Sequence, residues 1–260
     1  MPFRIGGGRR LGAAALVAAA GLPALAGCMS GGDDDEGRQQ LTVFAAASLS
    51  GAFSDIAEDF ESAHPGVAIR LGFDGSPGLV DQLVGGAPAD VFASADAPTM
   101  DRAVAEGLVA GEPTPLATNV LTLITPPGNP AGITGLDVSL DGARLVVCAE
   151  AVPCGAAARV LADAAGVELS PVSEESTVTD VRGKVTSGEA DAGIVYATDA
   201  RAVADRVEQV PIAGADAAPN VYPVAVLDRA ADAEMARRFV DAVTGPEGRA
   251  ALAEHGFGPP

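Results

Sequence analysis

Apolar residues follow two alternating spacings along most of the chain after residue 40. Short runs rich in β-branched residues predict strands, and runs with apolar residues three and four positions apart predict helices. Strands are expected at 41–45, 67–73, 89–95, 119–126, 143–149, 191–200 (ending in a turn) and 222–227. Helices are expected from Leu49 to the HPG at 64–66, and at 77–86, 98–106, 155–166, 180–188 and 232–253, the last broken near Gly245.

Strands that alternate with helices predict parallel or mixed sheets covered by helices on both faces. Two such units follow one another, so we expect an α/β protein with two lobes. Ligands of open α/β sheets bind at the carboxyl ends of strands, where helix N-termini present free N–H groups. Small or hydroxyl-bearing residues occur after predicted strands here, in AAASLS (45–50), DGSPG (74–78), AVPCG (151–155) and YATD (196–199).

Each of these segments also has a purely structural interpretation. Ser48 could be an N-cap, Ser76 part of a turn, Cys154 part of a helix start and Tyr196 a core aromatic residue. An enzymatic role is not favoured, because neither His64 nor the other histidine lies in such a segment and DGSPG lacks the spacing of a nucleophile elbow. We therefore do not expect an enzyme.

The first 27 residues have the pattern of an export signal. Arg4, Arg9 and Arg10 precede an apolar run from Leu11 to Gly27, which is short for a membrane span of about 20 residues. LAGC at 25–28 resembles a bacterial lipobox, which implies cleavage before Cys28 and lipidation of that residue. The polar, acidic, Gly-rich segment that follows is typical of a flexible tether.

Charge and cysteine content narrow the class further. The formal charge is −19, and loss of the three signal arginines leaves −22, so nucleic acid is not expected as a partner. The acidic residues are otherwise spread out, as on a solvated surface. With Cys28 assigned to lipid, Cys148 and Cys154 remain as an even pair in an oxidising compartment; we expect a disulfide, with two buried free thiols as the alternative.

Taken in order, the segments resemble one family. The chain is similar to the periplasmic molybdate-binding protein of ABC importers, which has the type II periplasmic binding fold. The resemblance covers most of residues 41–258 and rests on VFAAASL, GAPADVFASAD, VPCG, DVRG, GIVYATDA, YPVAV and the terminal GFG. It implies two α/β lobes, each a mixed sheet flanked by helices, with the ligand cleft between them.

The resemblance also implies a set of ligand-binding residues. Ser48 and Ser76 match the two serine ligands, Cys154 and Val181 match positions that donate a backbone N–H, and Tyr196 matches a hydroxyl donor from the second lobe. Molybdate near neutral pH is a dianion that only accepts hydrogen bonds, so a selective site should offer only donors. The metal would be bound as its oxyanion, with no direct metal ligand and no further cofactor.

Asp74 and Cys154 depart from the family pattern. Asp74 replaces a small neutral residue, and we expect its side chain to point to solvent; inside the pocket it would repel a dianion but could accept the proton of hydrogen phosphate. Cys154 replaces alanine, and a backbone contact survives that change. A disulfide to Cys148 would hold this donor in place.

The implied organisation is a signal peptide (1–27), a tether (28–40), a first lobe (41–120 and 222–260) and a second lobe (121–221). The protein would be exported, lipid-anchored at the outer face of the cytoplasmic membrane and monomeric, and would deliver molybdate or tungstate to a membrane permease after lobe closure. A receptor for phosphate or sulfate is the alternative, and a serine hydrolase is a remote one.

Overall fold

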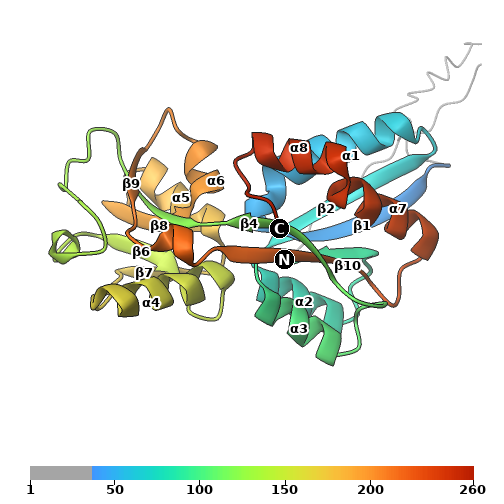
Figure 1. Ribbon diagram of the computed structural model, residues 1–260, viewed down its shortest axis with the longest axis horizontal. Helices are drawn as coiled ribbons and strands as arrows, with labels where there is room; N and C mark the ends of the chain where they lie inside the picture. The colour runs from blue at the N-terminus through green and yellow to red at the C-terminus, as the bar shows by residue number, and fades with distance from the viewer. Residues whose placement is uncertain (1–36) are drawn as a thin grey trace, which may run out of the picture. The chain divides into compact units, whose positions relative to one another are not determined.

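The computed structural model describes residues 37–260, which form two five-stranded mixed sheets (Figure 1). The first sheet has the order β2-β1-β3-β10-β4 and the second β7-β6-β8-β5-β9. The first contains β1 (Gln39–Ala46), β2 (Val67–Asp74), β3 (Val91–Ala93), β4 (Thr114–Asn119) and β10 (Asn220–Val226). The second contains β5 (Leu121–Thr125), β6 (Leu145–Cys148), β7 (Ser173–Glu175), β8 (Ala192–Tyr196) and β9 (Glu208–Pro211).

Helices cover both faces of each sheet. Around the first sheet, α1 (Ser50–Ala63), α7 (Ala233–Thr244) and α8 (Pro246–Glu254) lie on one face, and α2 (Ser76–Val84) and α3 (Ala97–Ala105) on the other (Figure 1). Around the second, α4 (Pro153–Ala165) lies opposite α5 (Val178–Thr186) and α6 (Ala197–Arg201). Short 3₁₀ helices occur at η1 (Ala47–Leu49), η2 (Val138–Leu140) and η3 (Ala215–Ala217).

Strand register brings several strand ends to the same level. β1 pairs in parallel with β2 from Gln39 opposite Val67 to Ala46 opposite Asp74, and β1 also pairs in parallel with β3. β6 similarly lies parallel to β7 and β8 in the second sheet. Because parallel strands present their carboxyl ends at one edge, the segments that follow β1, β2 and β3 lie together.

The apolar spacing found in the sequence corresponds to the buried faces. Leu41, Val43 and Ala45 of β1 are buried, as are Phe53 and Phe60 on α1. Small residues dominate the core, and the larger rings pack edge to face: the centroids of Phe53 and Phe60 lie 6.2 and 5.4 Å from that of Phe239.

Most predicted elements are present, with small shifts at their ends. The predicted strand at 119–126 corresponds to β5 of the second sheet, whereas β4, which ends at Asn119 in the first sheet, was not predicted. The sequence also missed β7 and β9, which are short and largely polar. The segment after Tyr196, expected as a turn, forms the short helix α6.

The chain passes between the sheets at Asn119–Leu121 and returns between Pro211 and Asn220, next to the predicted lobe limits at 120–121 and 221–222. Within the predicted tether (28–40), Gln39 and Gln40 already belong to β1. The predicted signal peptide and the lipidation site Cys28 lie outside the described residues.

Candidate functional site

A small pocket lies where segments of both sheets meet. The first sheet supplies the residues after β1, β2 and β3, and the second supplies the start of α4, the start of α5 and the end of β8. The lining residues are Ala46, Ala47, Ser48, Asp74, Gly75, Ser76, Ala95, Val152, Pro153, Cys154, Val178 and Tyr196. The sequence-predicted residues Ser48, Ser76, Cys154 and Tyr196 are therefore brought together.

Val181, the fifth predicted ligand residue, does not line this pocket. It is fully buried within α5, and its backbone N–H donates to Thr177 O at 3.4 Å. Val178, the first residue of α5, lines the pocket instead. Val181 thus lies one helical turn after the residue of α5 that lines the pocket. A sequence signal for the true helix start existed, since Thr177 and Asp180 have the spacing of an N-terminal capping motif, and Thr177 Oγ1 accepts from Asp180 N.

Three helices begin at the pocket, and their free N–H groups make it favourable for an anion. Ser76 is the first residue of α2 and Val178 the first residue of α5. In α4 the first residue is Pro153, which has no N–H, and the N–H of Gly155 donates to Val152 O at 2.9 Å. The N–H of Cys154 is left in the first turn, where the helix itself supplies no acceptor.

Two of the hydroxyl groups that line the pocket accept hydrogen bonds from neighbouring groups of the protein. Ser76 Oγ accepts from the backbone N–H of Ala95 at 3.0 Å. Tyr196 Oη accepts from Asn220 Nδ2 at 3.0 Å. Because each hydroxyl carries a single proton and its oxygen already accepts one bond, the proton is left to be donated elsewhere.

Ser48 has a comparable arrangement through Tyr222. Ser48 Oγ and Tyr222 Oη lie 3.0 Å apart, and Asn119 Nδ2 donates to Tyr222 Oη at 3.4 Å. When Ser48 donates its hydrogen bond to an ion that only accepts hydrogen bonds, the Tyr222 hydroxyl donates to Ser48 Oγ. Each of these hydrogen-bonding groups then keeps a partner.

Burial sets the protonation of the aromatic hydroxyls. It raises the pKa of Tyr196 well above its ordinary value, an effect to which nearby Tyr222 adds, and it also raises the pKa of Tyr222. Both phenols therefore remain donors at neutral pH. Behind them, burial raises the pKa of Asp199 to about 7 against the opposing effect of Arg182, whose Nη1 lies 3.5 Å from Asp199 Oδ1. Within the described residues, Asp199 Oδ2 has no hydrogen-bond partner.

Asp74 differs from its expected position. Its side chain is half-buried and lines the pocket, so the expectation that it points to solvent is wrong in part. Its Oδ1 accepts from the N–H of Gly75 at 2.7 Å and its Oδ2 from Gln82 Nε2 at 3.1 Å. Both oxygens are therefore bonded to groups of α2 and its preceding turn.

The predicted disulfide between Cys148 and Cys154 is present and confirms the pairing derived from the sequence. It joins the last residue of β6 to the second residue of α4. The turn between them is also held by the N–H of Val152, which donates to Ala149 O at 2.9 Å. The bridge thus closes the loop that carries the Cys154 N–H.

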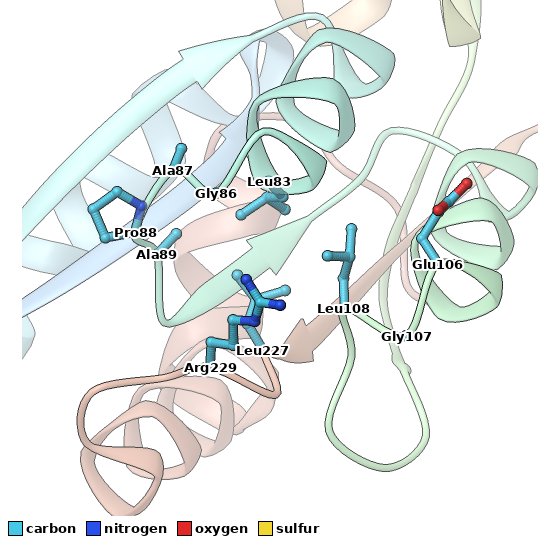
Figure 2. Close-up of a pocket in the computed structure, with 10 residues that line it drawn as sticks. All are labelled: Leu83, Gly86, Ala87, Pro88, Ala89, Glu106, Gly107, Leu108, Leu227 and Arg229. Atoms are coloured by element: carbon cyan, nitrogen blue, oxygen red, sulfur yellow. The ribbon is translucent and has the colours of Figure 1, made fainter.

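A second, larger pocket lies elsewhere on the first sheet's elements (Figure 2). It is lined by Leu83, Gly86, Ala87, Pro88, Ala89, Glu106, Gly107, Leu108, Leu227 and Arg229, and Figure 2 shows mostly short or aliphatic side chains. None of the sequence-predicted ligand residues belongs to it.

Two α/β halves with a donor-lined pocket between them are the architecture of a solute receptor. The chain belongs to the family described as bacterial extracellular solute-binding protein, whose model matches residues 41–258. The molybdate-binding protein ModA of Mycobacterium tuberculosis is 47% identical over 226 residues, which are 86% of this chain and 87% of that protein. ModA of Escherichia coli is 36% identical over 237 residues, 86% of this chain and 90% of that protein.

Among solved structures, the periplasmic molybdate-binding protein of Azotobacter vinelandii superposes with a TM-score of 0.75 at 22% identity, covering 85% of this chain and 99% of that one. This likeness shows the fold. Together with the family match, it confirms the predicted family and the two-lobed fold class. Among residues 37–260, no helix combines the length and apolar character needed to cross a membrane. In the same residues, no group of three or more His, Cys, Asp or Glu side chains could hold a metal ion.

Proposed function

We propose that this protein is the substrate-binding component of an ABC importer and that it binds molybdate, and also tungstate, in the pocket between its two sheets. The observation that carries the proposal is the state of the pocket hydroxyls. Ser76 Oγ and Tyr196 Oη already accept hydrogen bonds, so their protons are available for a ligand that only accepts. The molybdate-binding relatives support this choice of ligand.

The proposed donor set combines three hydroxyls and four backbone N–H groups. The hydroxyls are those of Ser48, Ser76 and Tyr196, and the N–H groups are those of Ser48, Ser76, Cys154 and Val178, with Val178 in place of Val181. A hydrogen bond to a charged group contributes about 1.5–3 kcal/mol. The seven donors together contribute about 10–20 kcal/mol, which covers the roughly 8–12 kcal/mol of micromolar to nanomolar binding after ordering costs.

Capture by lobe closure fits the contacts across the pocket. An added Cβ on Gly75, beside the first sheet, would lie 2.3 Å from the carbonyl oxygen of Ser176, beside the second. The two walls therefore approach closely enough for both to contact one small anion. We propose that the closed form docks on a membrane permease and that the lobes then open and release the anion to the permease.

Phosphate or sulfate is the alternative cargo, since a donor-rich pocket suits any tetrahedral oxyanion. Asp74 is the residue that could favour hydrogen phosphate, because it lines the pocket and can accept a proton. Calorimetric titration of the purified protein with molybdate, tungstate, sulfate and phosphate tests the proposal. Tight binding of molybdate and tungstate with no heat from the other two supports it; tight phosphate binding alone contradicts it.

We further propose that the protein is exported and lipid-anchored at Cys28, acts as a monomer and has no enzymatic activity or cofactor of its own. The LAGC motif supports the anchor, since two acyl chains give stable membrane attachment. Cys28→Ala should move the protein from the membrane fraction to the soluble fraction. An unchanged distribution would contradict the anchor without affecting the binding proposal.

A further inference from the structure

Asn220 lies at the point where the chain returns to the first sheet, as the first residue of β10. Its side-chain amide contacts both halves of the molecule. Nδ2 donates to the backbone oxygen of Ala95 at 3.2 Å and to Tyr196 Oη at 3.0 Å. Tyr196 is the last residue of β8 in the second sheet, and Ala95 follows β3 in the first.

The carbonyl of Ala95 fixes the orientation of this amide. A backbone carbonyl oxygen can only accept a hydrogen bond, so the Asn220 atom beside it must be the nitrogen rather than the oxygen. The second N–H of the same nitrogen points toward Tyr196 Oη and donates to it. Tyr196 therefore receives a hydrogen bond from Asn220 and cannot donate its own proton back to that group.

Ala95 also connects Asn220 to the other wall of the pocket. Its N–H donates to Ser76 Oγ, which is buried, while its carbonyl accepts from Asn220. Three hydrogen bonds thus run from Ser76 through Ala95 and Asn220 to Tyr196. At both ends of this chain a pocket hydroxyl accepts a hydrogen bond, so its own proton can be donated to another acceptor.

We propose that Asn220 is a positioning residue that makes Tyr196 a hydrogen-bond donor to the bound oxyanion, and so makes this wall reject ligands that carry a proton. The inference rests on the proposed function and extends it to specificity. Asn220 does not line the pocket, so its effect on ligand binding passes through the Tyr196 hydroxyl. A fully deprotonated oxyanion meets a donor there, whereas the hydroxyl of hydrogen phosphate meets no acceptor.

Molybdate titration of four proteins tests this role: the wild type, Asn220→Ala, Tyr196→Phe and the double variant. If Asn220 acts through the Tyr196 hydroxyl, Asn220→Ala weakens molybdate binding about tenfold in the wild-type background. In the Tyr196→Phe background it should change binding less than about twofold. An equal loss in both backgrounds would mean that Asn220 only supports the fold, and no loss in either would also overturn the proposal.

Thr198→Val is the matched control. Thr198 Oγ1 accepts from Asn119 Nδ2 at 2.8 Å, a hydrogen bond that also joins the two halves, but Thr198 does not line the pocket. Its loss should leave molybdate affinity within about twofold of the wild type. A loss as large as that of Asn220→Ala would assign the effect to the joint between the halves and overturn the positioning role.

Asn220→Leu, which keeps most of the side-chain volume, replaces Asn220→Ala if that variant does not fold, as judged by its melting temperature. Failure of the proposed function is separately visible. A wild-type protein that binds none of the four oxyanions contradicts the function and this inference together. A wild-type protein that binds molybdate, with an unchanged affinity in Asn220→Ala, contradicts this inference alone.

Discussion

The two pockets lie at opposite ends of the same helix. The proposed oxyanion pocket includes Ser76, at the N-terminus of α2, whereas the pocket in Figure 2 includes Gly86, just beyond its C-terminus. The C-terminus of α3 also reaches the second pocket, at Glu106 and Gly107. Helix N-termini favour anions and C-termini disfavour them. An anion should therefore distinguish the two pockets.

Volume does not identify the oxyanion pocket, which is the smaller of the two. The cavity in Figure 2 measures about 220 Å³, against about 10 Å³ for the oxyanion pocket. A small tetrahedral ion gains more from donors that surround it than from space, because its binding depends on replacing the hydrogen bonds it makes to water. The proposed assignment of the site therefore rests on the polarity of the helix ends and on the hydrogen bonds that the pocket hydroxyls already accept.

Placing a carboxylate in each pocket should give the largest contrast. Ser48→Asp removes a donor and adds a negative charge beside the dianion; at 4 Å a pair of unit charges repels by about 4 kcal/mol at an effective dielectric constant of 20. Molybdate affinity should fall about 1000-fold or more in a calorimetric titration. Leu108→Asp, in the pocket of Figure 2, should leave it within about twofold. A similar loss in both variants would contradict the assignment of the site.

Removal of one hydroxyl from the second-sheet wall should have the next largest effect. Tyr196→Phe keeps the ring, whose centroid lies 5.8 Å from that of Tyr222, and deletes one donor to the anion. A loss of about 1.5–3 kcal/mol corresponds to about 10- to 150-fold weaker molybdate binding. Titration should show this with little change in melting temperature. Unchanged affinity would exclude the second sheet's hydroxyl from the ligand set.

Gly75→Ala should impair closure of the pocket. The new Cβ would lie 2.3 Å from the backbone oxygen of Ser176, which cannot rotate away as a flexible side chain could. We expect about tenfold weaker molybdate binding, on the scale of about 1–3 kcal/mol for an overpacked contact.

Gly183→Ala is the control for this substitution. Gly183 lies inside α5, where an added Cβ meets no atom within 4 Å. It should leave molybdate affinity unchanged and stabilise the helix by about 0.5–1 kcal/mol in chemical denaturation. Equal affinities for Gly75→Ala and the wild type would show that the approach of the two walls is not needed for binding.

Loss of the disulfide should affect stability more than affinity. Replacing Cys148 and Cys154 together by serine removes about 2 kcal/mol of stabilisation for so short a loop. Because the Cys154 N–H stays at the helix start, molybdate affinity should fall only about threefold through loss of preorganisation. Denaturation and titration of the same preparation separate the two effects. Unchanged affinity would mean that the bridge does not hold the donor in place.

Sequence patterns predicted the pocket residues that follow strands directly. Ser48, Ser76 and Tyr196 each occur at a strand end with a small or hydroxyl-bearing neighbourhood, and the family resemblance selected them as ligand residues; all three line the pocket. The match at Val181 falls one turn inside α5, away from the pocket lining, because a short motif does not define where a helix begins.

The residues behind the pocket could not be predicted in the same way. Asn220 acts on Tyr196, 24 positions away, and Asn119 on Thr198, 79 positions away. These contacts depend on how the two segments that connect the sheets enter each sheet. The spacing of residues along the chain does not predict that arrangement. Similarly, β7 and β9 are defined by pairing to buried neighbours rather than by their own largely polar residues.

Asp74→Ala should have the smallest effect among the pocket variants. The carboxylate lines the pocket, but its oxygens are bonded to the N–H of Gly75 and to Gln82. Its removal relieves a like charge near the dianion and costs only contacts on the α2 side, so molybdate affinity should stay within about twofold or rise slightly. Titration with molybdate and phosphate in parallel measures this. A large loss of phosphate binding on this substitution would instead identify Asp74 as the acceptor for a protonated oxyanion, and the anion cargo would then be phosphate.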